Sequence, residues 1–460
     1  MGGIAAALLV ALVTAALPGG RTGQRPVPTR NESAIRSALA SGTGLVQLGP
    51  GVIEIASELA LPLGAHDLEI RGASSGTVLR ASANFQGRAV LVIRSAVRIR
   101  LANFSIDGNR AALERPLGLP PSDVPFFRYY RDNGILAEAV ESLAITDLKL
   151  VNVANFAVLV AGSRKVRIER VRISDSGSRN AAGRNNTSGG ILLEEGTAGF
   201  EVRECVLRNV RGNGIWTHSL YTSPRNRDGL IAGNEFRELA RDAIQVGHAT
   251  NVRVESNRGS RIGYPASEVE PGALPVAIDT AGNTDRSVYA RNRFEEVNGK
   301  CIDLDGFHHG EVRNNTCVNR QPREAYPFGH FGIVMNNTNP DMESEGITVA
   351  DNEIDGAVYG GIFVIGSEHR ILRNRLRNLN QARCTPAKPG CVYWADEPDL
   401  LSSGIYLGRR AERPAVTRGN LIRDNEISGF GIKCIAAAPG VSLQANQVAG
   451  NRCEGFGSKP

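Results

Sequence analysis

The stretch CIDLDGFHHG, residues Cys301–Gly310, has the alternation of a short β-strand with one polar face. Ile302 and Leu304 fall on one side of such a strand, because strand side chains have a period of two. Asp303 and Asp305 fall on the other side. Two outward acids followed by two histidines are unusual for a strand with only a structural role. The stretch therefore predicts both a fold element and a candidate site.

Copies of this strand recur along the chain, each with a small residue followed by an aliphatic one. The pairs are Gly134-Ile135, Ala157-Val158, Gly190-Ile191, Gly214-Ile215, Ala243-Ile244, Ala277-Ile278, Cys301-Ile302, Gly332-Ile333, Gly361-Ile362, Gly404-Ile405 and Cys434-Ile435. Ile278 and Ile302 are 24 residues apart, and longer spacings indicate the same unit with an inserted loop. Self-similarity at about 20–50 residues is typical of solenoids and other repeat arrays.

A second signal in each unit is an asparagine at a fixed place. The phrases AGNEF, ARNRF, ADNEI, LRNRL, RDNEI and QANQV place Asn234, Asn292, Asn352, Asn374, Asn425 and Asn446 in one register, and Cys205 takes this place in RECVL. Asparagine tolerates a left-handed turn and can hydrogen-bond to the asparagine of the next coil. Three short strands per unit with such a ladder predict a parallel β-helix, whose stacked coils share one core.

The N-terminal part carries a helix pattern at Glu32–Ala40 with Asn31 as its cap. The phrases VQLGPGVIEIASELAL (Val46–Leu61) and LEIRGA (Leu68–Ala73) follow. Together they resemble the pectin-lyase-like superfamily, whose members often open with a helix, a V-x-L-x-P-G-x-x-x-I strand–turn–strand and an L-x-I-x-G strand. The resemblance covers about Ala34 to the C-terminus. It implies an all-β fold, a right-handed parallel β-helix with three-strand coils and a short N-terminal capping helix, of the polysaccharide lyase or glycoside hydrolase type.

The chain divides by composition into a leader, a linker and one long repeat domain. The apolar run GIAAALLVALVTAAL ends in small residues and predicts a signal peptide at 1–20, so we expect a secreted or periplasmic protein without a membrane span. We expect a linker at 21–30, the cap and first coils at 31–86, and the β-helix at 87–460. Its loop inserts are expected at 110–133, 175–188, 259–275, 320–330 and 381–402.

The positions of these inserts predict a groove. All five are expected on one edge of the first sheet, and a second set at 220–228 and 337–345 on its other edge. Loops on both edges make that sheet the floor of a groove, and loops on a rigid scaffold commonly carry function. The aromatic residues of the first insert, Phe126, Phe127, Tyr129 and Tyr130, either pack on the flank or line a sugar subsite, and we favour packing.

Aligning the first strands of successive coils brings three acids together on this floor. Asp279 and Asp303 are expected to be direct neighbours, because stacked coils lie about 4.8 Å apart. Asp305 shares the strand of Asp303, and Gln245 lies one coil before Asp279. His218 is expected on the same floor three coils before Asp305, and Asn336 one coil beyond it.

Clustered carboxylates repel, so one should have a raised pKa or a cation should lie among them. A protonated aspartate could donate to a glycosidic oxygen while an ionised partner activates water or attacks the sugar. Alternatively, the acids could bind Ca²⁺ and neutralise a uronate while a separate base abstracts a proton. Candidates for that base are His218, His308, His309, Lys300 and a loop arginine such as Arg323.

The predicted catalytic residues are Asp279, Asp303, Asp305, His309 and His218. The predicted substrate contacts are Trp216, Gln245, His308, His330, Asn336, Lys300 and Arg323. No metal site is predicted for hydrolysis. Polygalacturonases of the superfamily carry acids just ahead of the small–aliphatic pairs, whereas this chain has Leu274-Pro275-Val276 and Gly299-Lys300 there. Only Gly329-His330-Phe331 is similar to their Gly-His-Gly phrase, so their mechanism is not carried over.

Charge and cysteines complete the prediction. The net charge of +6 mildly favours an acidic glycan, and the absence of a basic run or a known binding motif argues against nucleic acid. Seven cysteines in an exported protein allow disulfides. Cys384 and Cys391 are the first choice, and Cys301–Cys317 and Cys434–Cys453 have similar placements, which leaves Cys205 as a buried thiol.

We therefore expect a monomeric secreted enzyme that cleaves a polysaccharide along the groove, by hydrolysis with clustered aspartates and without a cofactor. A lyase or uronate epimerase acting on an acidic glycan, with Ca²⁺, is the first alternative. A non-catalytic glycan-binding or surface β-helix protein is the second, since fold alone does not give function.

Overall fold

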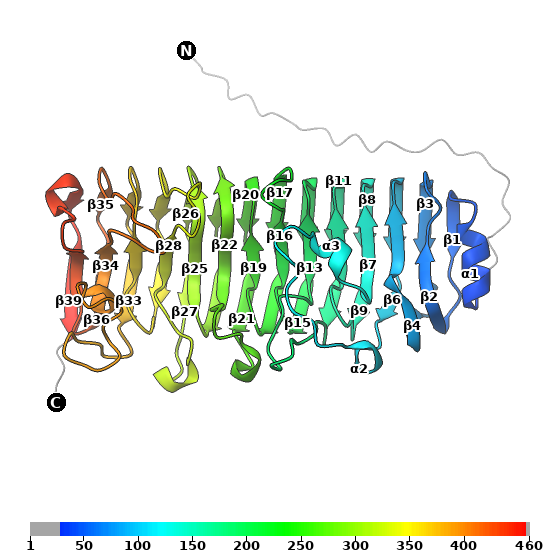
Figure 1. The fold of residues 1–460 in the computed structure, drawn as a ribbon, viewed down its shortest axis with the longest axis horizontal. Helices are drawn as coiled ribbons and strands as arrows, with labels where there is room; N and C mark the ends of the chain where they lie inside the picture. The colour runs from blue at the N-terminus through cyan, green and yellow to red at the C-terminus, as the bar shows by residue number, and fades with distance from the viewer. Residues whose placement is uncertain (1–27, 457–460) are drawn as a thin grey trace, which may run out of the picture.

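The computed structural model describes residues 28–456, and they form the predicted parallel β-helix (Figure 1). The predicted signal peptide at 1–20 and most of the predicted linker lie outside the described residues. Every pairing between named strands is parallel, and each coil contributes one strand to each of three long faces. Within the described residues, no helix is both long and apolar enough to cross a membrane.

The first face, the floor sheet, carries the candidate site. Its strands are β4 (Thr77–Arg94), β7 (Asn133–Glu138), β10 (Val158–Ala161), β13 (Ile191–Glu194), β16 (Ile215–His218), β19 (Ile244–Val246), β22 (Val276–Asp285), β25 (Lys300–His308), β28 (Ile333–Asn336), β31 (Ile362–Val364), β34 (Ser403–Leu407) and β37 (Lys433–Ala437), and β2 (Gly51–Ala60) pairs with β4.

The other two faces close the coil. The second consists of β1 (Gly44–Gln47), β3 (His66–Arg71), β5 (Val97–Ala102), β8 (Glu141–Thr146), β11 (Arg164–Glu169), β14 (Ala198–Arg203), β17 (Asn226–Ala232), β20 (Ala249–Glu255), β23 (Val288–Ala290), β26 (Glu311–Arg313), β29 (Thr348–Ala350), β32 (Arg370–Leu372), β35 (Leu421–Arg423) and β38 (Gln447–Ala449). The third consists of β6 (Ser105–Asp107), β9 (Lys149–Val151), β12 (Arg172–Ser174), β15 (Val206–Val210), β18 (Glu235–Leu239), β21 (Arg258–Ile262), β24 (Arg293–Val297), β27 (Thr316–Val318), β30 (Glu353–Asp355), β33 (Arg375–Leu379), β36 (Glu426–Phe430) and β39 (Arg452–Phe456).

The helices are short and lie outside this core. They are α1 (Glu32–Leu39), α2 (Arg110–Leu113) and α3 (Phe126–Tyr129), with 3-10 turns η1 (Ala266–Glu268), η2 (Arg323–Ala325), η3 (Leu400–Ser402) and η4 (Leu443–Ala445). The Asn31 side chain accepts a hydrogen bond from the Ala34 amide, as predicted for the cap of α1. Ile35 and Leu39 are buried against the first coils, so α1 covers the core at the N-terminal end.

The aliphatic residues that identified the repeat point into the core. Ile278 and Ile302 pair in register and are fully buried, as are their counterparts Ile244 and Ile333 in the flanking coils. Their shared inward face explains why the small–aliphatic pairs repeat, because one coil cannot bury them alone.

The asparagine ladder is confirmed, with one correction. Each backbone amide donates to the next asparagine side chain through Asn234, Asn257, Asn292, Asn315, Asn352, Asn374, Asn425 and Asn451. The assignment of Asn446 was wrong: Asn446 accepts from the Asn420 amide, in a second ladder at another bend, which also includes His369. The two bends lie close in sequence in the last coil, which explains the error.

The predicted disulfide between Cys384 and Cys391 is present, and so are the two pairs with similar placements, Cys301–Cys317 and Cys434–Cys453. Cys205 is free and buried at a ladder position, and burial raises the pKa of its thiol to about 12. A thiol that stays protonated at neutral pH has a structural rather than a nucleophilic role.

Candidate active site

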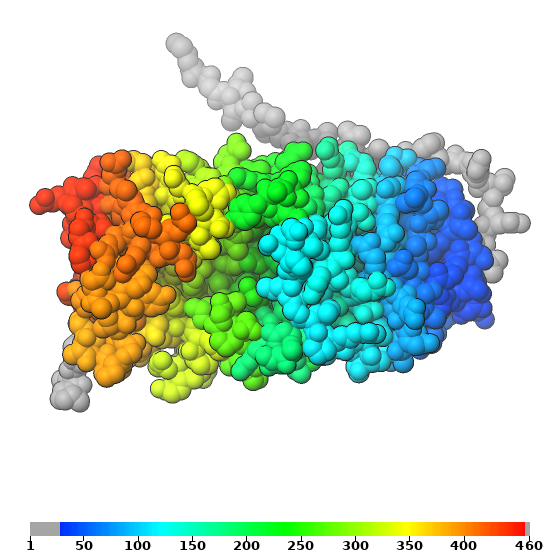
Figure 2. All heavy atoms as spheres, in the orientation of Figure 1, coloured from blue at the N-terminus to red at the C-terminus, as the bar shows by residue number. Residues whose placement is uncertain are grey.

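A cavity of about 710 Å³ opens on the floor sheet in the middle of the solenoid. Figure 2 shows this face hollowed between the insert at 110–133 in cyan and the loops near the C-terminus in orange. The floor of the cavity consists of the outward residues Gln245, Asp279, Asp303, Val334 and Phe363. The predicted register is confirmed: Gln245 pairs with Asp279, and Ile278 with Ile302, which places Asp279 beside Asp303.

Asp279 is buried at the centre of this floor. Its Oδ2 accepts a hydrogen bond of 2.7 Å from Gln245 Nε2, and Gln245 Oε1 accepts one of 2.6 Å from Asn213 Nδ2. Burial, followed by the charges of Asp242 and Asp303, raises the pKa of Asp279 well above its ordinary value. The chain of amides thus orients a carboxyl group that holds its proton more tightly than an ordinary aspartate does.

Asp303 differs from its neighbour because it has a cation beside it. Lys300 Nζ donates to Asp303 Oδ2; Asp303 is buried, and the Lys300 side chain is 13% exposed. Burial alone would lower the pKa of Lys300, but the carboxylates of Asp303, Asp279 and Asp305 outweigh burial and raise it. Lys300 therefore stays charged, and its ammonium group forms an ion pair with the Asp303 carboxylate.

Asp305 lies at the second outward position of β25, opposite Asn336. Its two oxygens accept hydrogen bonds from Thr338, at 2.9 Å from the amide and 2.7 Å from the hydroxyl. Burial and the nearby Asp303 raise its pKa to about 6. With both oxygens in use, Asp305 fixes the loop at 337–345 to the edge of the cavity.

Sequence analysis missed a fourth acid, Asp242, which also lines the cavity. Asp242 is 1% exposed, accepts a hydrogen bond of 2.9 Å from the Val276 amide and contacts Arg241 at 3.4 Å. Burial raises its pKa. Its only sequence signal is its place directly before the Ala243-Ile244 pair, where strand periodicity does not yet define a direction.

Two buried polar atoms of the cavity lack a hydrogen-bond partner within the described residues, Asp303 Oδ1 and His330 Nδ1. Burial, with a smaller effect of Lys300, lowers the pKa of His330 to about 3, so its imidazole is neutral at neutral pH. Buried polar groups normally have partners, and those without one commonly serve a ligand. The two atoms are therefore candidate contacts for a bound molecule.

The wall toward the C-terminus comes from two loops, of which only the insert at 381–402 was expected at the edge of the groove. Tyr393, Trp394, Leu400 and Leu401 come from the predicted insert at 381–402, and Arg410 from the loop after β34. The Arg410 guanidinium lies 4.4 Å from the centre of the Trp394 ring. Aromatic side chains at the rim of a polar cavity are suited to packing against a sugar ring.

The cavity thus brings together six of the predicted site residues in addition to Asp303: Asp279, Asp305, Gln245, Lys300, His330 and Asn336. The others lie outside it. His308 and His309 lie at the end of β25, where His309 Nε2 is 4.0 Å from Glu345. Arg323 is in η2, within the insert at 320–330, and does not line the cavity.

Trp216 and His218 lie on the floor but under the first insert. The Phe126 ring is 4.8 Å from Trp216 and 4.9 Å from His218, centre to centre. This confirms that the aromatic insert packs on the sheet. His218, Glu194 and Glu195 have ligand atoms close enough to hold a metal ion, but Glu194 is also bound by the amides of Phe126 and Phe127. Burial raises the pKa of Glu194 to about 8 and lowers that of His218 to about 4.

Comparison with known proteins defines the class. The sequence matches the family described as "Right handed beta helix region" at residues 127–274 and 190–378, which together span more than half of the chain. The chain belongs to the right-handed β-helix family. A comparison with curated proteins gave no match.

Solved structures with similar folds have low sequence identity. DFA-IIIase from Arthrobacter chlorophenolicus A6, without its lid, is 16% identical over 75% of this chain and 91% of its own, with a TM-score of 0.55. Its C387A mutant in complex with DFA-III is 14% identical over 91% and 94%, also with a TM-score of 0.55. Bacteriophage phi29 gene product 12, in its pre-mature form, is 14% identical over 91% of this chain but 55% of its own, with a TM-score of 0.58. At these identities the likeness concerns the fold alone.

Proposed function

We propose that this protein is an exported carbohydrate-active enzyme that hydrolyses a glycosidic bond over Asp279 and Asp303. The observation that carries the proposal is the contrast between these neighbours. The pKa of Asp279 is raised by burial, whereas Asp303 forms an ion pair with Lys300. Two carboxyl groups with opposite protonation states are what glycosidic cleavage requires.

In the proposed reaction, Asp279 donates its proton to the glycosidic oxygen as the bond breaks, and Asp303 forms an ester with the anomeric carbon. Water, deprotonated by Asp279, then hydrolyses this ester, which releases the sugar and restores both carboxyl groups. Neighbouring strands place the two residues about 4.8 Å apart. This spacing is close to the ~5–5.5 Å between carboxyl groups in retaining glycosidases, so we favour a nucleophilic role for Asp303 and retention of configuration. Asp305 and Asp242 contribute negative charge beside this pair.

Export and a sugar ligand have independent support. Disulfides persist in oxidising compartments, and three are present among the described residues. The carbohydrate-active enzyme DFA-IIIase has a similar fold, and one of its structures holds DFA-III. The cavity itself has more acidic than basic side chains, which favours a neutral saccharide over the acidic glycan expected from net charge.

A lyase acting on an acidic sugar is the second candidate. His330 supports it by position, because it lines the cavity and its Nδ1 has no hydrogen-bond partner within the described residues, although its lowered pKa makes it a weak base. Ca²⁺ held by the acidic floor would be needed to neutralise the sugar carboxylate. The raised pKa of Lys300 argues against Lys300 as the base.

The test is a product analysis across neutral and acidic glycans, with and without a chelator. New reducing ends without ultraviolet absorbance support hydrolysis, and NMR of the first product distinguishes retention from inversion. An absorbing unsaturated product that requires Ca²⁺ supports the lyase. Saturable binding without turnover of any glycan supports a binding protein and contradicts both enzymatic proposals.

A further inference from the structure

The floor of the groove is covered on both sides of the cavity. Toward the N-terminus, the next floor residue after Gln245 is Trp216, which pairs with it in register. Trp216 is 6% exposed beneath Phe126 and does not line the cavity. Leu192, Leu159 and the preceding floor positions are also buried under this insert. A chain lying along the floor therefore cannot continue in this direction.

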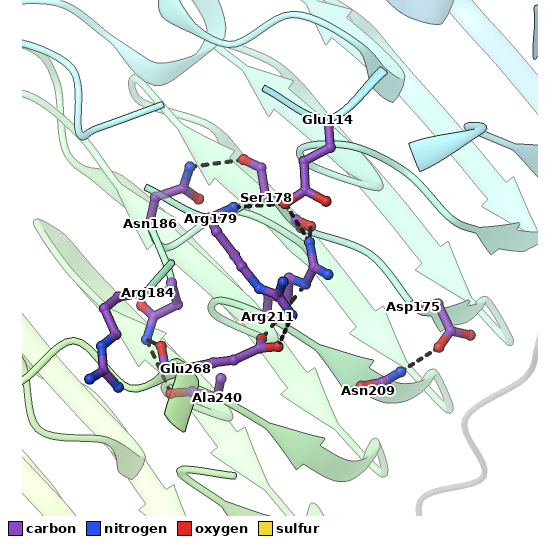
Figure 3. A network of polar contacts seen from close by, with 12 residues as sticks. Glu114, Asp175, Ser178, Arg179, Arg184, Asn186, Asn209, Arg211, Ala240 and Glu268 are labelled. Atoms are coloured by element: carbon purple, nitrogen blue, oxygen red, sulfur yellow. Dashed lines mark hydrogen bonds and ion pairs between the residues drawn. The ribbon is translucent and has the colours of Figure 1, made fainter. Parts of the chain in front are cut away.

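The insert that covers this side is held in place by a network of polar contacts (Figure 3). The Arg211 guanidinium donates to Glu114 at 2.5 Å and lies 3.6 Å from Glu268. Arg179 also pairs with Glu268. These contacts join three inserts, at 110–133, 175–188 and 259–275, and the last of these lines the cavity through Gly272 to Leu274. The N-terminal cover and the side wall are thus one connected structure.

A corresponding cover lies toward the C-terminus. Phe363 is the last floor residue that lines the cavity, and its ring stacks on that of Tyr406, the next floor residue, at 6.2 Å. Tyr406 is 1% exposed, and its hydroxyl donates to Glu397 of the insert at 381–402 at 3.0 Å. Trp394 and Leu401 of the same insert face the cavity. The disulfide between Cys384 and Cys391 closes this loop.

We infer that the cavity takes a short saccharide or the end of a longer chain, and does not bind a polymer that runs through it. This inference rests on the proposed function for the kind of ligand, and on the two covers for its length. The open floor from Gln245 to Phe363 spans four strand spacings, or about 20 Å. A hexose unit is about as long as one spacing, so the floor holds roughly four units. A volume of about 710 Å³ is that of a site for a small ligand.

The test combines binding and cleavage. Asp303→Asn protein is titrated by calorimetry with neutral oligosaccharide ladders of two to eight units, namely cello-, xylo-, manno-, malto- and fructo-oligosaccharides. The affinity should rise with oligosaccharide length up to about four units, and it should change by less than about twofold for longer oligosaccharides. Wild-type protein acting on the corresponding polymer should release reducing ends with little early loss of viscosity. Affinity that keeps rising to eight units, or an early fall in viscosity, overturns the inference.

These results separate the inference from the proposed function. Turnover with internal cleavage supports the enzyme and overturns the short-ligand inference. Binding that levels off without turnover supports the inference and contradicts the enzyme. If the protein binds none of these oligosaccharides, both the inference and the proposed function are overturned.

Trp394→Ala tests the C-terminal boundary, with Val392→Ala as the control on the same loop. Trp394 lines the cavity, whereas Val392 is 39% exposed and does not. In Trp394→Ala, the oligosaccharide length at which the affinity levels off should increase by about one unit. In Val392→Ala, this length should be unchanged. Identical profiles for the two variants overturn this boundary.

Discussion

Two parts of one sheet carry opposite chemistry on the same backbone. In β10, β13 and β16 the outward floor residues are Leu159, Leu192 and Trp216, all buried under the aromatic insert. In β19, β22 and β25 they are Gln245, Asp279 and Asp303, which form the floor of the cavity. The strands pair in one continuous parallel register across both parts. The scaffold therefore supplies positions, and the outward side chains with their inserts decide whether a position becomes core or site.

The largest effect on activity is expected when the acids of the open part are removed. Asp279→Asn and Asp303→Asn should each lower kcat/KM by roughly 10²–10⁴-fold, since general acid–base groups contribute about that much. Asp279→Asn should leave the thermal midpoint unchanged or raise it, because it replaces a carboxyl group whose charged form is disfavoured by burial with a neutral amide of nearly the same shape. Kinetics and thermal unfolding of the same preparations check both statements.

Asp228→Asn is the matched control for these variants. Asp228 is an exposed residue of β17, on the second face and away from the cavity, where it contacts Asn251 and Arg227. Its kinetics should equal those of the wild type. Wild-type turnover by both Asp279→Asn and Asp303→Asn would remove this pair from the site.

The second prediction compares one substitution in the two parts. Leu192→Asn should destabilise the protein by about 3–5 kcal/mol, because it leaves a cavity and an amide without a partner under the insert. Val334→Asn, on the open floor, should cost less than half of this, because water in the cavity can solvate the amide. Thermal unfolding measured by circular dichroism gives both values. Equal losses of stability in the two variants would mean that water reaches Val334 no better than it reaches Leu192.

The repeat was predictable because every coil carries the same pattern of a small residue followed by an aliphatic one. The buried position of Ile278 repeats at Ile302 and Ile333, so the register that places Asp279 beside Asp303 follows from counting. The ladder was misassigned only at Asn446, where two bends of the last coil both carry asparagine.

The parts of the site that lie off the strands were not predictable. Asp242 precedes its strand at a bend, where period two does not apply. Trp394 and Arg410 meet across two separate loops, so no spacing in the sequence connects them. Trp216 has the correct floor position, but the sequence does not say over which coils the aromatic insert folds back.

The third prediction concerns pH and the charge of the open part. The folded-state pKa of Asp305 is about 6, above the ordinary value of 3.8. The folded state therefore holds its proton more tightly than the unfolded state does. This stabilisation is complete below about pH 4 and is lost as pH rises to about 6, by up to roughly 3 kcal/mol.

Asp305→Asn removes this dependence. The thermal midpoint of the wild type should fall relative to that of Asp305→Asn between pH 4 and pH 6, and then run parallel to it up to pH 8. Asp228→Asn, the exposed control, should follow the wild type throughout. A constant difference between the wild type and Asp305→Asn over the whole range would contradict the assignment.

The smallest effect is expected at the network that braces the covered part. Arg211 is 12% exposed and lies between Glu114 and Glu268, so Arg211→Ala leaves two partly buried carboxylates with less compensation. It should cost about 1–2 kcal/mol and increase cleavage of the insert at 110–133 by proteases under native conditions. Arg208→Ala removes a surface pair with Glu235, in which Arg208 is 53% exposed, and should stay within about 0.5 kcal/mol of the wild type. If the two variants behave alike, the packing of Phe126 and its aromatic neighbours alone holds the insert. The polar network would then contribute no measurable stability.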